Sequence, residues 1–208
     1  MNPNVEPILT ALLAHVALQV AVAFTGDTSV GSADISNVSN FTGIFVGIGV
    51  AGPGIPADTA VDSFDANAGT ITLSKQATAD ETTAAFHAGF LTVGRRLKEW
   101  AKTPNQPALF LRHIGDDDTF NGILSQTELD AEWWIYCRTG DPDAIPDTGL
   151  NNLVRAVRLA MVPDDSMQYR FTIGGLCHWC RIEGRSTYDD GALNGQSKAL
   201  LPVKITLP

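Results

Sequence analysis

TELDAEWWIYCR, residues 127–138, is the stretch that decides the fold most directly, because apolar and polar residues alternate along it with a period of two. Such alternation is typical of a β-strand with one face in a hydrophobic core. The face expected in the core carries Leu129, Ala131, Trp133, Ile135 and Cys137. The opposite face carries Glu128, Asp130, Glu132, Trp134 and Tyr136. We therefore predict a core strand that leaves two aromatic residues on an otherwise acidic face.

The segments on either side of this strand predict the rest of one domain. Strands are expected at residues 107–114, 170–183 and 198–207. Between them, an apolar stripe at helical spacing predicts a helix that Asp147 or Thr148 caps. The stripe consists of Leu150, Leu153, Val154, Val157 and Met161, and Pro163 ends the helix. The fold class that follows is α/β of the α+β type, a mostly antiparallel sheet flanked by helices.

Residues 8–24, ILTALLAHVALQVAVAF, predict a buried helix that begins after Pro7. Its buried stripe is expected to hold Ile8, Leu9, Leu12, Leu13, Val16 and Val20, and His15 is expected to be a hydrogen-bonded core residue. A membrane span and an export signal are the alternatives. The run is at the short limit for a span, and Glu6 stands where a signal peptide needs positive charge. We expect no membrane contact, and a cytoplasmic chain whose three cysteines stay reduced.

The composition changes near residue 25 and changes back near residue 89. The stretch 25–89 is rich in Gly, Ser, Thr, Ala and Asp, and its seven acidic residues and one basic residue give a charge of −6. Short strands are expected at 32–38, 41–50, 59–64 and 70–74, with turns between them. We predict an inserted module at 25–89, β-sandwich-like or a small barrel, and a core domain formed by residues 1–24 and 90–208.

The charge of the whole chain is −9 at pH 7, which argues against a protein that grips nucleic acid. Phosphate contacts supply most of the affinity in such proteins, and they require a basic surface. An acidic balance is compatible with a ring through which DNA passes without specific binding.

Three patterns could carry chemistry, and the residues favour a structural interpretation of each. Cys177 and Cys180 form a CxxC, which could bind zinc with Cys137 and His178 or His113, or act as a redox pair. We expect both thiols in a strand, where an offset of three residues points them to opposite faces. The aspartates at 116–118 are expected in a solvated turn, and the GxGxxG at 47–52 lacks a following helix. We therefore predict no metal, no cofactor, no catalytic residue and no enzyme activity.

The outer segments resemble the tail terminator-like proteins of siphophages, a family of minor tail and virion structural proteins. The resemblance is carried by LTVGRRLKEW at 91–100, QPALFL at 106–111, AEWWIY at 131–136, TGLNNL at 148–153, and FTIGGL at 171–176 through Trp179. The inserted stretch resembles a β module of phage virion proteins. There the matching phrases are TGDT at 25–28, VG at 46–47, GPGIP at 52–56 and GTITLS at 69–74.

The resemblance implies a virion protein that is made in the host bacterial cytoplasm and forms a hexameric ring. Such a ring caps the tail tube near the head–tail junction and joins the tail to the head, so its partners would be the tail tube protein and a head-completion or connector protein. Another head–tail connector or completion ring is the first alternative. The second alternative is a decoration or host-surface-binding role for the inserted module.

Aromatic residues among polar neighbours are common where subunits meet, and a cyclic assembly needs two different patches on each subunit. Trp134 and Tyr136 are the candidates for one patch. The second patch is expected to consist of arginines of the core domain, which could pair with the acidic strand of a neighbouring subunit. The candidates are Arg95, Arg96, Arg155 and Arg158.

Overall fold

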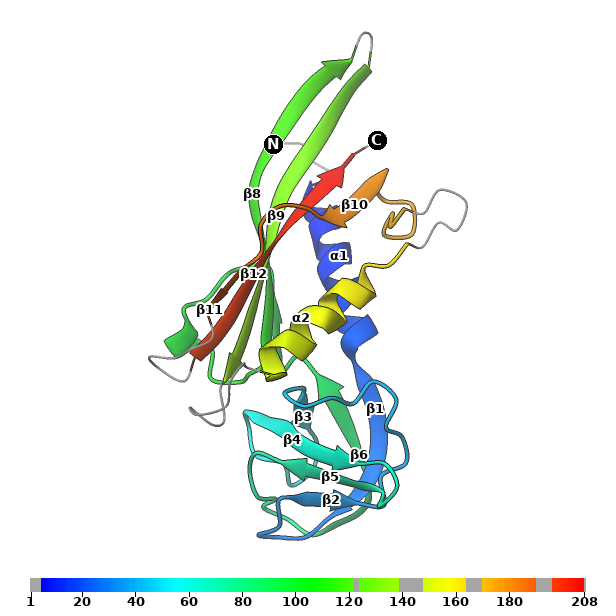
Figure 1. Ribbon diagram of the computed structural model, residues 1–208, viewed down its shortest axis with the longest axis vertical. Coiled ribbons are helices and arrows are strands. Elements are labelled where there is room, and N and C mark those ends of the chain that lie inside the picture. The colour runs from blue at the N-terminus through cyan, green and yellow to red at the C-terminus, as the bar shows by residue number, and fades with distance from the viewer. Residues whose placement is uncertain (1–4, 122–123, 139–147, 164–169, 190–195, 208) are drawn as a thin grey trace.

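The protein is an α+β protein in which a closed β-barrel adjoins a second sheet and two helices (Figure 1). The computed structural model describes residues 5–121, 124–138, 148–163, 170–189 and 196–207. The helical elements are α1 (Val5–Val20), η1 (Trp100–Lys102) and α2 (Thr148–Ala160). The barrel strands are β1 (Val22–Thr28), β2 (Asp34–Ser36), β3 (Gly49–Ala51), β4 (Thr59–Asp65), β5 (Thr70–Leu73) and β6 (Glu81–Gly89). The sheet strands are β7 (Thr92–Gly94), β8 (Ala108–Asn121), β9 (Leu124–Arg138), β10 (Trp179–Ile182), β11 (Thr187–Asp189) and β12 (Gln196–Thr206).

The barrel closes in the order β1-β2-β5-β4-β3-β6, with β6 paired back to β1. Its interior is filled by apolar side chains from alternating positions: Phe24, Ile35, Val50, Val61, Ile71, Leu73 and Phe86. Strands β1 and β2 approach so closely at Gly26 that a Cβ atom on this residue would lie 2.5 Å from a methyl group of Ile35. Only glycine fits a position with so little space, so the sequence Thr25-Gly26-Asp27 fixes the place where β1 bends.

The barrel differs from the sequence expectation at three strands. The predicted helix was expected to run to residue 24, but α1 ends at Val20 and β1 begins at Val22. Strand β6 was not predicted, and most of 41–50 forms turns, with a strand beginning only at Gly49. The apolar run at 20–24 fits a helix and a barrel strand equally well, so its composition alone does not mark the change.

Strand β9 lies at the centre of the second sheet, between β8 and β12. The sheet is antiparallel except where β7 runs parallel to β8. The predicted core face of β9 is confirmed, since Leu129, Ala131, Trp133, Ile135 and Cys137 are all buried. The register of β12 on β9 places Ala199, Leu201, Val203 and Ile205 beside that face, and they are buried too.

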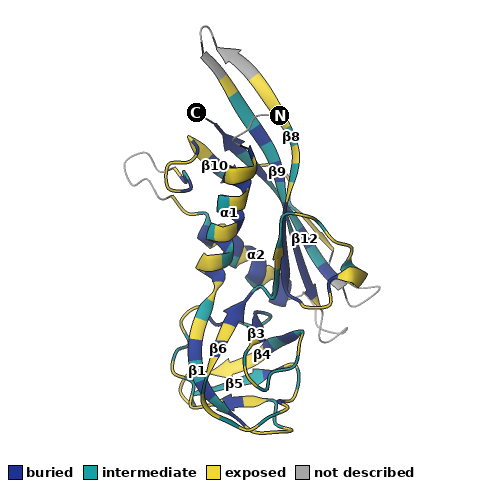
Figure 2. Cartoon of the chain, turned by 180° about the vertical axis from the view of Figure 1, so that it is seen from behind, coloured by how far each residue is buried: buried dark blue, intermediate teal, exposed yellow. Residues whose placement is uncertain are grey.

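Both helices contact this face of the sheet and each other, and Figure 2 shows their inner sides as buried. The predicted stripe of α1 is buried throughout, as are Leu150, Leu153, Val154 and Val157 of α2. The hydrogen bond expected of His15 is confirmed, since its Nε2 lies 3.1 Å from the carbonyl oxygen of Ala160, but the residue is half-buried and lies at the margin of the core. Asp147, one of the two predicted caps, lies outside the described residues. None of the described helices is both long and apolar enough to cross a membrane.

The distal parts of β8 and β9 extend beyond the rest of the sheet as an arm (residues 114–121 and 124–130; Figure 1). Strand β12 still pairs with residues 128–130, and residues 118–121 and 124–127 form a two-stranded ribbon. The pairing shifts at Ile114, between His113 and Gly115, so a bulge marks the base of the arm. The expectation of a turn at residues 116–118 was wrong. The three aspartates pair with Leu129, Glu128 and Thr127 inside β8, because β9 continues alongside them.

The expectation for the CxxC was also wrong in its geometry. Residues 173–178 form turns, and β10 begins only at Trp179, so Cys177 precedes the strand that holds Cys180. The argument from strand register therefore does not apply to this pair. All three cysteines are buried.

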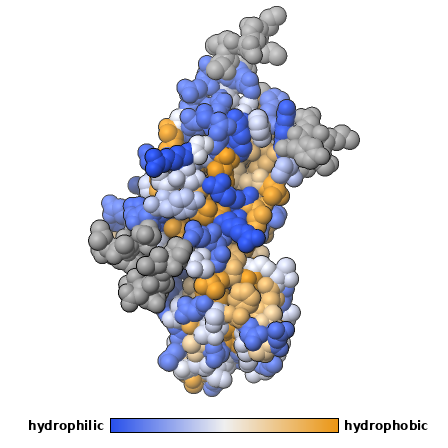
Figure 3. All heavy atoms as spheres, viewed as in Figure 1, coloured by the Kyte–Doolittle hydropathy of each residue, from blue (hydrophilic) through white to orange (hydrophobic). Residues whose placement is uncertain are grey.

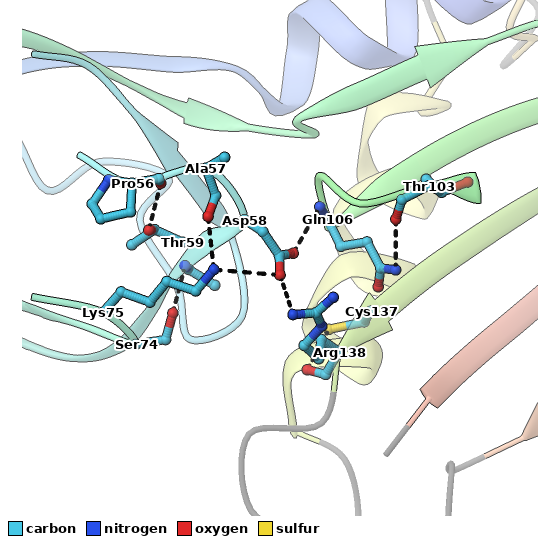
Figure 4. A network of polar contacts seen from close by, with 11 residues as sticks. Pro56, Ala57, Asp58, Thr59, Ser74, Lys75, Thr103, Gln106, Cys137 and Arg138 are labelled. Carbon is cyan, nitrogen blue, oxygen red and sulfur yellow. Dashed lines mark hydrogen bonds and ion pairs between the residues drawn. The ribbon is translucent and has the colours of Figure 1, made fainter. Parts of the chain in front are cut away.

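A buried carboxylate joins the barrel to the sheet (Figure 4). Asp58, whose side chain is 8% exposed, forms ion pairs with Lys75 of the barrel and with Arg138 at the end of β9. Its Oδ1 also accepts the backbone N–H of Gln106 at 3.0 Å. A buried charge is tolerated when such partners surround it. We call Asp58 with these three partners the Asp58 joint, and it fixes the position of the barrel relative to the sheet.

We expect Asp58→Ala to lower the free energy of unfolding by about 3 kcal/mol, because it leaves a buried N–H without an acceptor and keeps a backbone φ of +59° that disfavours alanine. Asp58→Asn should cost about 1 kcal/mol, since asparagine tolerates this φ and can still accept from Gln106. Urea unfolding of both variants tests this. Equal losses in the two variants would contradict the role given to the hydrogen bond.

A second carboxylate closes the barrel where β1 meets β6. Asp27 Oδ1 accepts the backbone N–H of Thr83 at 2.6 Å, and its Oδ2 accepts Asn37 Nδ2 at 2.6 Å. Thr83 and Asn37 both have positive φ, a conformation that the two hydrogen bonds help to hold. Both hydrogen bonds hold the pKa of Asp27 below its ordinary value, and the bond from the Asn37 side chain contributes more than the bond from the Thr83 backbone.

The stabilisation from Asp27 should therefore be fully present above the ordinary carboxyl pKa and be lost as the pH falls through the lowered one. We expect wild type to be more stable than Asp27→Asn at about pH 6, and the difference to vanish towards about pH 2. Chemical unfolding of both proteins across this range measures the difference. A gap that stays constant with pH would show that the charge of Asp27 contributes nothing.

Candidate interaction surfaces

The face of the sheet opposite the helices carries a small aromatic cluster built on Tyr136. Its ring centroid lies 5.4 Å from that of Trp100, 5.6 Å from Phe110 and 6.4 Å from Trp134. The Tyr136 hydroxyl donates to the carbonyl oxygen of Lys98 at 3.1 Å. The segment that leads from β7 into η1 thus covers Tyr136, which is only 5% exposed, and burial raises the pKa of its hydroxyl.

Trp134 lies at the margin of this cluster and is half-buried. Its indole N–H donates to Glu132 Oε2 at 3.2 Å. Part of the indole ring remains exposed at the surface. Tyr136, the other predicted aromatic contact, is covered by its own chain and is not presented to a neighbour in this conformation. Of the two aromatic candidates, Trp134 alone retains an accessible ring.

Arg95 connects three elements of its own chain. Its guanidinium donates to the carbonyl oxygen of Leu111 in β8 and forms an ion pair with Glu6 in the first turn of α1, at 3.1 Å. Its side chain is 20% exposed. Arg95 therefore fastens the start of α1 to the sheet, whereas its neighbour Arg96 is exposed.

Arg155 and Arg158 lie one turn apart on the exposed side of α2. Arg158 donates to Ser186 Oγ at 2.9 Å, and Arg155 borders a groove of about 360 Å³ between α2, the end of α1 and the barrel. The groove is lined by Gln19, Val20, Val22, Gly43, Phe45, Asn152, Arg155, Ala156, Leu159 and Ala160. Figure 3 shows apolar and strongly hydrophilic atoms side by side over α1 and α2, at the level where the barrel meets the sheet.

The six predicted interface residues thus form three separate groups and no single site. The sequence analysis missed the groove, because its walls come from α1, β1, the 41–46 segment and α2, which are far apart along the chain. A signal was present in exposed apolar residues near helix ends. Leu18 is 72% exposed, Leu159 57% and Val162 54%.

A second, more polar pocket of about 390 Å³ lies where β10 meets the base of the arm, lined by Gln126, Glu128, Arg170, His178, Trp179, Arg181 and Thr206. The guanidinium of Arg181 lies 3.9 Å from the ring centre of Trp179. Arg181 also pairs with Glu183, and this hydrogen bond lowers the pKa of that carboxyl. Arg181 is therefore committed to its own chain.

The described part of the chain gathers no three His, Cys, Asp or Glu side chains that could hold a metal ion. No protein-family model matches the chain, and no curated protein matches it. Its function therefore has to be argued from the surfaces described above and from the resemblance carried by the sequence.

Removal of the Tyr136 hydroxyl should reveal how firmly the covering segment is held. We expect Tyr136→Phe to cost about 1 kcal/mol at pH 7, because the Lys98 carbonyl loses its donor. Since burial raises the pKa of Tyr136, the stability of wild type should fall relative to the variant above about pH 10, where the unfolded tyrosine ionises. Urea unfolding at pH 7 and at pH 10.5 or so gives both values. A difference that grows with pH would contradict this account.

Proposed function

We propose that this protein is a structural virion subunit of a tailed bacteriophage, a tail terminator that assembles into a hexameric ring. The ring caps the tail tube, joins it to the head through a completion or connector protein, and lets the genome pass without binding it specifically. The sequence resemblance over the core domain names this class, and the arm is the observation that carries the proposal structurally.

The arm supports assembly because a two-stranded ribbon is marginally stable in water on its own. The register of β12 on β9 ends at Glu128, with one further bond from the Leu207 N–H to the carbonyl oxygen of Thr127, and pairing of β7 with β8 covers residues 108–110 alone. Beyond these points each strand of the arm presents an edge without a described partner strand. Exposed edges of this length invite a further chain, and a ring subunit supplies one in its neighbour.

The Asp58 joint also favours a ring subunit over a tethered binding module. The barrel contacts the core domain at a second place, where the carbonyl oxygen of Val46 accepts Asn152 Nδ2 at 3.2 Å. Next to it, a Cβ on Gly47 would lie 2.4 Å from the Cα of Gly149. These two contacts add to the chain crossings in holding the barrel against the core domain, and a ring requires subunits of fixed shape.

Light scattering and negative-stain electron microscopy of the purified full chain test the proposal. We expect closed rings with about six times the 22.2 kDa of one chain. Addition of purified tail tube protein should place these rings at tube ends. A protein that stays monomeric at all concentrations, alone and with tube protein, would overturn the proposal, and rings that bind the head connector alone would favour the connector alternative.

The exposed part of Trp134 makes it a test of the interface. We expect Trp134→Ala to weaken ring formation at least about tenfold while lowering the melting temperature by a few degrees, since only part of the ring is packed in its own chain. Val30→Ala is the matched control, because Val30 is an exposed apolar residue of the barrel at 61%. Loss of folding with unchanged association in the folded fraction would place Trp134 in the core alone.

A further inference from the structure

We propose that the acidic arm of one copy docks on the exposed face of α2 of a second copy, with Asp116 and Asp118 against Arg155 and Arg158. The inference rests on the proposed function in that it takes a second copy of this chain as the partner. The proposed function requires contacts between copies, and this inference specifies that the arm of one copy meets α2 of the next in a head-to-tail contact.

The arm has an excess of negative charge. From Ile114 to Asp130 the sequence holds five acidic residues and no Lys, Arg or His. Asp117 and Glu128 are directly opposed across the two strands, an arrangement in which like charges destabilise the pair. This pair lies on one face of the arm, and Asp116 and Asp118 add two further carboxylates on the other face.

One cation from the same chain offsets part of this charge. Lys204 of β12 lies 2.8 Å from Glu128 and 3.2 Å from Asp130, and the hydrogen bonds to these carboxylates raise the pKa of the lysine. The aspartates at 116–118 are exposed and form no ion pair with any described residue. Asp116 and Asp118 project from the same face of β8, because successive residues of a strand alternate. They form a pair of carboxylates that a single cationic patch can neutralise.

The face of α2 offers the complementary charge. Arg155 and Arg158 are exposed, three residues apart on one side of the helix, and neither forms an ion pair within the described parts of the chain. Arginine pairs with carboxylates through two parallel hydrogen bonds, which fixes orientation as well as adding energy. Two arginines can therefore receive the two aspartates of the arm.

The two surfaces match in apolar character as well as in charge. Ile114, at the bulge where the arm begins, is 48% exposed. Leu159 lies next to Arg158 on α2, lines the groove and is 57% exposed. A contact that buries such residues beside the ion pairs has the apolar centre and charged margin typical of protein interfaces.

The contact has to form between copies because the arm extends away from the barrel and the groove in its own chain (Figure 1). The two patches differ in structure, so the contact is head-to-tail, which closes into a ring when the rotation between copies permits. This is the geometry that a ring subunit needs, and it leaves Trp134 free to contribute elsewhere in the interface.

The test uses charge reversal in the full chain, read by light scattering. Asp116→Lys/Asp118→Lys reverses the arm, and Arg155→Glu/Arg158→Glu reverses the face. Each variant alone should associate at least about tenfold more weakly than wild type, because like charges then meet. An equal mixture of the two should regain the assembly, since the reversed arm fits the reversed face and the remaining arm and face are native.

A control separates surface charge from position. Asp62→Lys changes an exposed acid of the barrel, away from the arm and α2, and it should assemble like wild type. If a charge-reversed variant fails to fold by circular dichroism, Asp116→Asn/Asp118→Asn and Arg155→Gln/Arg158→Gln replace the pair, and each should make assembly less sensitive to salt than it is in wild type.

The outcomes also separate this inference from the proposed function. Wild-type rings with variants that assemble equally well would overturn the docking of arm on α2 and leave the ring intact. Variants that fail alone and are not restored by mixing would show that the two surfaces do not meet each other. A wild-type chain that never assembles would overturn the proposed function itself.

Discussion

The Asp58 joint is the constraint on which the arrangement of the whole molecule depends. Its carboxylate lies between two bodies that the chain connects twice, at α1–β1 and at β6–β7. The bond from Asn152 to the Val46 carbonyl supports the same arrangement. Because a buried charge without partners is costly, the barrel position that brings Lys75, Arg138 and the Gln106 N–H to Asp58 is strongly preferred. Thr59 and Ser74 form hydrogen bonds alongside, which hold the barrel loop that carries the carboxylate (Figure 4).

A fixed barrel gives the surfaces of the molecule a fixed relation. The groove beside α2 exists because the barrel meets the helices there, and the arm lies at the end of the second sheet that is farthest from the barrel (Figure 1). Strand β9 spans this distance, with the Asp58 partner Arg138 at one end and the acidic residues of the arm at the other. Strand β9 therefore carries the joint at one end and pairs at the other with the part of β8 that holds Asp116 and Asp118. A disturbance at Asp58 should reach the assembly through the placement of the groove.

Prediction from the sequence succeeded where burial imposes a period. Apolar residues recur at every second position of β9 and at helical spacing along α2, so only one secondary structure buries all of them in each segment. It failed where two structures fit the same residues. The residues at 20–24 are compatible with both a helix and a strand. The aspartates at 116–118 are compatible with a turn, and only their pairing with β9 shows that they are in a strand. Cys177 is likewise compatible with a strand, but residues 173–178 form turns and bends. Only tertiary partners decide such cases.

Interface residues were harder to predict for a related reason. Trp134 and Tyr136 share one face of one strand and look equivalent in sequence, yet the segment ending in η1 covers Tyr136 and leaves part of Trp134 at the surface. Likewise Arg95 and Arg96 are neighbours, and only the first meets Glu6 and β8. A local pattern gives the face of a residue, but whether that face remains accessible depends on which distant segment crosses it. This is why the arm and the α2 face are the surfaces on which assembly is best sought, since Asp116, Asp118, Arg155 and Arg158 all remain exposed even though Arg158 also donates to Ser186.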